Sequence, residues 1–250
     1  MQTDVAEQAS SQAPLNRRVP LIDVLRGVAL AAMAVYHFAW DLSFFSLAEF
    51  GVTENPLWIA FARAIAGSFL ALVGVGLYLA HGDGAKWKPF LRRLAMIAAA
   101  ALAISIASIV ADPDGVILFG ILHCIAVSSV IGLLFLRAPL ALVIAAAIAC
   151  LVAPSFLTSP AFNDLGWVWL GLGSEVRPSN DYNPLLPWFG MVLAGIAIAR
   201  IIPRDKWPRW QPHDVVTRML ALIGRHSLLF YLLHQPVLLG TLWAVAKAIG

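Results

Sequence analysis

Four ionisable side chains lie on one face of the first long apolar segment, IDVLRGVALAAMAVYHFAWDL, which begins at Ile22. They are Asp23, Arg26, His37 and Asp41, at successive intervals of 3, 11 and 4 residues. At about 100° per residue, a helix gathers all four within an arc of about 60°. On one helical stripe these side chains need protein or water around them, because hydrocarbon does not solvate charge.

His37 is the member of this stripe best suited to proton transfer. An imidazole titrates near neutral pH, and Asp41, one turn further along, can orient it as a general base. Arg26 lies eleven residues earlier, about 16 Å along a helix, where a guanidinium can bind an anionic group. Asp23 and Arg26 are also spaced to pair with each other, and this alternative stays open.

The last apolar segment, HSLLFYLLHQPVLLGTLW, carries a second polar stripe. Pro236 leaves the carbonyl of residue 232 without its helical donor, so His234 and Gln235 can serve either a site or the repair of this kink. The stripe consists of four polar residues that share an arc of about 80°: Ser227, Tyr231, His234 and Thr241.

A third histidine, His123, is the only charged-type residue in the apolar stretch GILHCIAV. It fits a helix–helix hydrogen bond as well as a place in a site. No two histidines stand at the i, i+4 spacing typical of helical metal sites, so we expect no metal. Dinucleotide, ATP and hydrolase motifs are not found in the sequence.

The composition indicates which elements position these residues. Of the 250 residues, 60% are hydrophobic and 12% are charged, whereas a soluble domain is about a quarter charged. The apolar residues form long runs and do not alternate with polar ones, which excludes an outer-membrane barrel. The sequence therefore predicts an all-α, polytopic transmembrane helix bundle, and the net charge of +3 does not indicate a nucleic-acid partner.

Seven segments are long and apolar enough to span a bilayer. Between the fifth and sixth, segment 165–172 is too short to span, so we expect it at the interface or re-entrant, anchored by Trp167 and Trp169. Residues 1–16 are polar and predict a disordered cytoplasmic tail, leaving 17–250 as the membrane domain. The predicted spans are 21–42, 56–80, 90–111, 115–136, 138–157, 184–202 and 226–248.

The positive charges predict the orientation of the bundle. With the N-terminus in the cytoplasm, 14 of the 17 Lys and Arg residues fall on the cytoplasmic side. Cytoplasmic loops of membrane proteins carry this excess of positive charge. Seven spans then put the C-terminus outside.

Four stretches resemble one family of membrane enzymes. The first segment is similar to the opening helix of the transmembrane acyltransferase superfamily, with Asp23, Arg26 and Gly27 followed by His37, eleven residues after the arginine. Three more stretches narrow the resemblance to the bacterial family that shares the catalytic domain of heparan-α-glucosaminide N-acetyltransferase: FGILHCIAV, DYNPLLPWFGMVLAGI and GRHSLLFYLLHQPVL.

This resemblance implies transfer of an acyl group, acetyl in the first instance, from cytoplasmic acetyl-CoA to a sugar amine or hydroxyl at the outer side. It implies no metal cofactor, a multi-pass protein of the inner membrane, and partners that are the acyl donor, a carbohydrate acceptor and the bilayer; a homo-oligomer stays open. His37 and Asp41 are then the expected catalytic residues, and Arg26 and Asp23 the donor-binding ones. The expected site-lining residues are His123, Asp181, Trp188, Tyr231, His234 and Gln235.

A small proton-coupled transporter is the alternative from another functional class. Its relay would consist of His37, His123 and His234. Transporters of this kind commonly contain internal repeats with matching helix breaks. The sequence contains no such repeat, and Pro236 has no counterpart in an earlier span.

Overall fold

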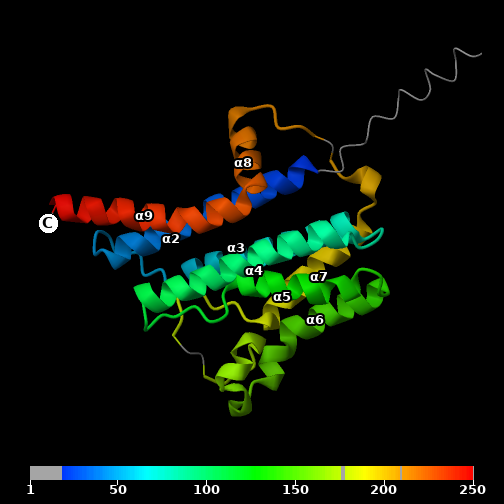
Figure 1. The fold of residues 1–250 in the computed structure, drawn as a ribbon, viewed down its shortest axis with the longest axis horizontal. Helices are drawn as coiled ribbons and strands as arrows, with labels where there is room; N and C mark the ends of the chain where they lie inside the picture. Colours follow the sequence, from blue (N-terminus) through cyan, green and yellow to red (C-terminus); the bar gives the residue numbers. More distant parts are fainter. Residues whose placement is uncertain (1–18, 176–177, 209, 250) are drawn as a thin grey trace, which may run out of the picture.

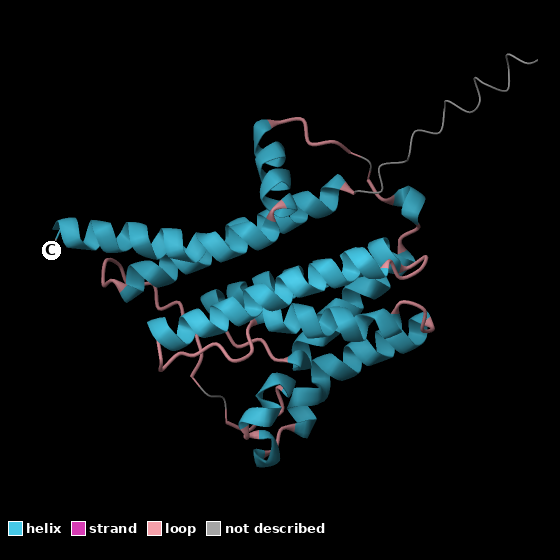
Figure 2. Cartoon of the chain, in the orientation of Figure 1, coloured by secondary structure: helices cyan, strands magenta, loops and turns pink. Residues whose placement is uncertain are grey.

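The computed structural model describes residues 19–175, 178–208 and 210–249. Figure 2 shows that the described chain consists of helices joined by loops, with no strand in those ranges. The predicted tail, 1–16, lies outside the described residues. The all-α fold expected from the composition is confirmed.

In the described ranges, five helices are long and apolar enough to cross a membrane, and two shorter apolar helices accompany them. Each of the seven coincides with a predicted span. The five long ones are α2 (Pro20–Phe44), α3 (Pro56–His81), α4 (Trp87–Ala111), α6 (Leu140–Leu157) and α9 (Ser227–Ile249). The two shorter ones are α5 (Ile121–Phe135) and α7 (Leu185–Ile201).

The fourth predicted span begins later than the hydropathy suggested. We expected a helix from residue 115, but α5 starts at Ile121 and has 15 residues. It is about 22 Å long at 1.5 Å per residue, which is less than the roughly 30 Å of a bilayer core. α7, with 17 residues, is also shorter than the bilayer core is thick.

The loops before α5 and α7 run beside each other. The amide N–H of Asn180 donates to the carbonyl of Gly115 over 3.1 Å, and that of Asn183 donates to the carbonyl of Phe119 over 3.1 Å. The Asn180 side chain also donates to Asp112 over 2.7 Å. Because irregular backbone within a membrane must find its partners in protein, this pairing explains how two short helices can be completed by coil.

Segment 165–172 forms a 3-10 helix, η2 (Leu165–Leu170), after the short η1 (Pro160–Phe162). Trp167 and Trp169 on it are exposed, as we expect of anchors at a membrane interface.

The region between α7 and α9 contains a helix that the sequence analysis missed. After the short η3 (Arg204–Lys206), α8 covers Val215–Arg225. Its N-terminus is capped by Asp214, whose Oδ1 accepts the Thr217 N–H over 2.9 Å. The hydrogen bonds from Thr217 lower the pKa of the exposed Asp214 carboxyl. In Figure 1, α8 lies across α2 while α9 runs alongside α2.

Glycines allow α2 and α8 to touch at the backbone. A Cβ on Gly27 would lie 2.0 Å from the carbonyl oxygen of Leu220, and a Cβ on Gly224 would lie 1.8 Å from that of Asp23. Such contact is typical of small residues at helix crossings in membranes. It fixes the end of α8 beside the first turns of α2.

Candidate active site

The last span brings two of its polar residues against the first. The rings of His37 on α2 and His234 on α9 have centroids 5.1 Å apart. One turn further along α2, Asp41 is fully buried, and its Oδ1 accepts a 2.7 Å hydrogen bond from the side-chain amide of Gln235. These four residues, of which Asp41 and Gln235 are 194 positions apart, form what we call the α2–α9 cluster.

Asp41 therefore has a partner that the sequence did not suggest. We expected it to orient His37, but the hydrogen bond that the structure gives it runs to Gln235. The ring of His37 instead packs edge-on against Tyr36, with centroids 5.7 Å apart. The side-chain amide of Gln235, which the sequence offered to a site or to the kink at Pro236, donates to this carboxylate.

The tautomer of His234 follows from its backbone contact. Its Nδ1 lies 2.7 Å from the carbonyl oxygen of Tyr231. Because a carbonyl only accepts, Nδ1 must carry the proton, and in the neutral ring Nε2 is left as an acceptor. That Nε2 is buried and has no hydrogen-bond partner among the described residues.

Two more acceptor atoms of the α2–α9 cluster are buried without a hydrogen-bond partner among the described residues. They are Oδ2 of Asp41 and Oε1 of Gln235. Buried polar atoms are satisfied in most native structures, so three such atoms at one place call for an explanation. All three accept hydrogen bonds when Asp41 is ionised, so a group that donates N–H or O–H would complete them.

A second cluster surrounds Asp181, in the loop before α7. Its carboxylate accepts the Ile121 N–H over 3.0 Å, the Tyr231 hydroxyl over 3.3 Å and a short bond from the Asn183 side chain. Burial raises the pKa of the Asp181 carboxyl. These residues, together with His123, make the Asp181 cluster.

Both ring nitrogens of His123 have protein partners. Nδ1 accepts the Gly120 N–H over 3.3 Å, which leaves Nε2 as the donor to the Ser105 hydroxyl, 3.4 Å away. Ser105 in turn donates to the carbonyl of Ile117 over 2.6 Å. His123 thus makes the interhelical hydrogen bond that the sequence allowed as one of its two roles.

Tyr231, a member of the Asp181 cluster, also contacts the α2–α9 cluster. Its hydroxyl reaches Asp181, while its ring lies 5.8 Å from that of His234. Trp188, the remaining site-lining candidate, packs in the main core of the bundle, near Gly67 on α3.

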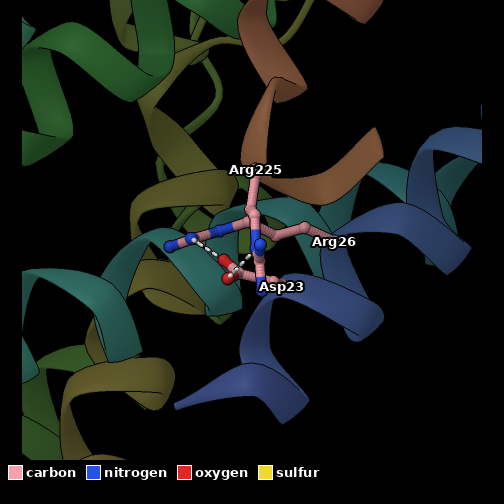
Figure 3. Close-up of polar contacts among 3 residues, drawn as sticks. All are labelled: Asp23, Arg26 and Arg225. Carbon is pink, nitrogen blue, oxygen red and sulfur yellow. Dashed lines mark ion pairs between the residues drawn. The ribbon is translucent and has the colours of Figure 1, made fainter. Parts of the chain in front are cut away.

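A third cluster occupies the start of α2, where the carboxylate of Asp23 lies between two arginines (Figure 3). Nη1 of Arg26 is 3.7 Å from Oδ1, and Nε of Arg225 is 3.4 Å from Oδ2. Arg26 also extends over α3, since a Cβ on Gly76 would lie 2.7 Å from its Nη2. The predicted pair of Asp23 and Arg26 is present, but Arg225 was missed because the helix that carries it was not expected.

A model of the family described as heparan-alpha-glucosaminide N-acetyltransferase, catalytic, matches residues 18–236. The chain belongs to this family. The match runs from the start of α2 into α9, so it includes all three polar clusters of this heparan-α-glucosaminide N-acetyltransferase-type domain. Membership indicates a membrane acetyltransferase and confirms the resemblance seen in the sequence. Neither the curated proteins nor the solved structures contain a match to the chain.

Within the ranges that the structure describes, no three His, Cys, Asp or Glu side chains gather as a metal ion would require.

Proposed function

We propose that the protein moves an acetyl group from cytoplasmic acetyl-CoA to an amine or hydroxyl of a sugar at the outer side of the membrane. The observation that carries the proposal is the contact of two imidazoles, His37 and His234, inside the membrane domain of a member of an acetyltransferase family. Acyl transfer needs a group that accepts a proton from the nucleophile, and imidazole serves this purpose at neutral pH.

The reaction can be written from the proposed roles. The acceptor oxygen or nitrogen attacks the thioester carbonyl, its proton goes to an imidazole, and the carbon–sulfur bond breaks. The imidazolium then returns the proton to the leaving thiolate, giving free CoA. In an alternative route, His37 attacks the thioester carbonyl and CoA leaves as its thiolate. The acyl group then passes from His37 to the acceptor, whose proton goes to the thiolate.

The arginines at the start of α2 support binding of the donor at the cytoplasmic end. The guanidinium groups of Arg26 and Arg225 meet at the carboxylate of Asp23, so two cationic donors lie together at this end of the bundle. Guanidinium groups form strong charge-assisted hydrogen bonds with phosphates, and CoA carries several. His37 lies eleven residues beyond Arg26, about 16 Å along the helix, so the flexible arm of CoA would run along α2.

The orientation rests on the 14-to-3 division of Lys and Arg. A periplasmic reporter fused after Gly250 should be active, and one inserted after Pro212 should be inactive. An inactive reporter after Gly250 would mean that the chain crosses the membrane an even number of times. The proposed direction of transfer, from the cytoplasm to the outer side, would then lose its support.

The test of the function is acetyl transfer by purified protein. Radiolabelled acetyl-CoA is incubated with protein in a detergent free of hydroxyl groups, with and without glucosamine. We expect labelled N-acetylglucosamine or O-acetylated sugar, and slow hydrolysis without acceptor. Absence of transfer to any amine or hydroxyl acceptor by folded protein, together with no binding of acetyl-CoA, would refute the proposal.

A further inference from the structure

An apolar groove of about 540 Å³ opens beside the α2–α9 cluster. Its walls come from α2, the end of α8 and the first half of α9. Leu229, Leu233 and Val237 line it and are each more than half exposed, so in a membrane the groove opens toward lipid. Only two of its lining residues carry a polar side chain, His226 near one end and His234 on the wall that it shares with the cluster.

This lining fits a hydrocarbon chain and does not fit the arm of CoA. That arm contains amides, and an amide placed in an apolar groove without partners costs free energy. A methylene chain loses nothing there and gains by leaving water. The groove therefore fits a substrate other than the acyl donor.

The polar wall of the groove defines what the other end of the occupant must offer. His234, which lines the groove, has at Nε2 a buried acceptor without a donor among the described residues, as do Gln235 at Oε1 and Asp41 at Oδ2 in the same cluster. The carbonyl of a thioester only accepts hydrogen bonds and leaves these atoms unsatisfied. A hydroxyl or amine in the groove donates such a bond to His234 Nε2, and these are the groups that acyl transfer acylates.

We propose that the acceptor is an amphiphile: a sugar hydroxyl or amine that donates to His234 Nε2, carried on a hydrocarbon chain that lies in the groove. This rests on the proposed function, whose acceptor it specifies. The nucleophile then reaches the two imidazoles from the bilayer, while the donor comes from the cytoplasmic end of α2.

A chain-length series tests the inference. Methyl, butyl and octyl glucosaminides are compared with free glucosamine as acceptors, with acetyl-CoA and protein in nanodiscs. Each methylene buried in the groove should lower KM about fourfold until the groove is filled. Partition of longer chains into the bilayer would produce a similar trend, so a variant must separate the two.

Val237→Trp narrows the groove, and Val245→Trp changes an exposed valine on α9 that does not line it. Both variants leave partition unchanged. We expect Val237→Trp to raise KM for the octyl glucosaminide at least about tenfold and to leave transfer to free glucosamine unchanged, whereas Val245→Trp should behave as wild type. Equal KM for all acceptors, or equal effects of the two variants, would overturn the inference and leave the proposed function standing.

A readout of binding does not depend on turnover. An octyl glucosaminide with a diazirine at the chain end is photolysed on the protein, and labelled peptides are found by mass spectrometry. Labels within 222–238 that disappear in Val237→Trp support the groove, even if no transfer is seen and the proposed function fails. Labels that lie elsewhere, or persist in Val237→Trp, overturn it.

Discussion

The α2–α9 cluster and the Asp181 cluster meet at Tyr231 but differ in how their hydrogen bonds are completed. Asp181 accepts from a backbone amide, an amide side chain and a hydroxyl, and both nitrogens of His123 have partners. In the α2–α9 cluster, each of Asp41, His234 and Gln235 has a buried acceptor without one among the described residues. We propose that the first arrangement serves the architecture and that the second binds a ligand.

The difference has a structural cause. The Asp181 cluster is built where two loops and the starts of two short helices converge, so backbone amides are available to complete it. The α2–α9 cluster is built between two helices, and apart from the Leu232 carbonyl that Pro236 leaves without its donor, their backbone groups are paired within each helix. Side chains alone can satisfy polar groups there, and three acceptors exceed the donors available.

The largest loss of turnover is expected from a substitution at His37, and its absence would contradict the distinction between the two clusters. A general base contributes typically 10²–10⁴-fold to rate, so His37→Ala should lower turnover by about this factor. The variant should remain folded, since alanine favours the helix and a polar group leaves the membrane interior. Turnover is measured as acetyl transfer, with melting temperature and size exclusion as checks of folding.

The matched control for His37 is His123→Ala, because His123 is satisfied within the other cluster. It should affect stability more than rate. Equal loss of function at positions 37, 123 and 234 would favour the proton relay of a transporter, and near-wild-type transfer by His37→Ala would end the role proposed for it.

The Asp181 cluster should respond in stability. Asp181→Ala leaves the Ile121 N–H and the Tyr231 hydroxyl without their acceptor, and we expect a loss of about 3 kcal/mol in the free energy of unfolding. Thermal melts in detergent measure it. A rate loss like that of His37→Ala in a variant of unchanged stability would contradict the division between the clusters.

The pH dependence of stability sharpens the same point. Burial raises the pKa of Asp181, so the ionised carboxylate is less favourable in the folded than in the unfolded protein. Its contribution to stability is therefore lost as pH rises from the ordinary carboxyl pKa of about 4 through the raised folded value. Asp181→Asn should flatten this dependence, and melts between pH 4 and 7 will show whether the wild-type slope persists in the variant.

At the start of α2 we expect a loss of donor affinity. Arg26→Ala removes a charge-assisted contact to phosphate, so the Kd for acetyl-CoA should rise about tenfold or more. Arg26→Lys should restore only part of this, since lysine lacks the bidentate fork. Isothermal titration measures it, and an unchanged Kd in Arg26→Ala would assign Arg26 to pairing with Asp23 alone.

The smallest effect is expected from Asp41→Asn. Asparagine keeps an acceptor for Gln235 and removes the negative charge beside the imidazoles, so turnover should fall less than in His37→Ala. If it falls as far as in His37→Ala, Asp41 takes a direct part in the proton transfer.

Much of the bundle could be predicted from hydropathy because a membrane demands long apolar helices. The start of α5 could not, because residues 115–120 are apolar enough for a helix, and their extended path depends on pairing with Asn180 and Asn183 in a distant loop. α8 was missed for the opposite reason: an eleven-residue helix among basic residues gives no span-length signal.

For the site, the helical stripes predicted only part of what faces inward: His37, Asp41 and His234 come together, but Thr241 is exposed and Gln235 was not on the predicted stripe. The partner of Asp41 depends on the rotation of α9 against α2. Arg225 could have been found only through the Gly27–Leu220 and Gly224–Asp23 contacts that bring α8 onto α2.

The pairing of the first helix with the last has a consequence for biosynthesis. Asp41 and Gln235 are 194 residues apart in the chain, and at 5–20 residues per second the ribosome needs about 10 to 40 s to make that stretch. During that time α2 stays in the membrane with Asp23 and Asp41 unmatched by Arg225 and Gln235. A nascent chain that stalls before α8 would therefore lack the Arg225 partner of Asp23 and the Gln235 partner of Asp41, and the cell's quality-control proteases would meet it in that state.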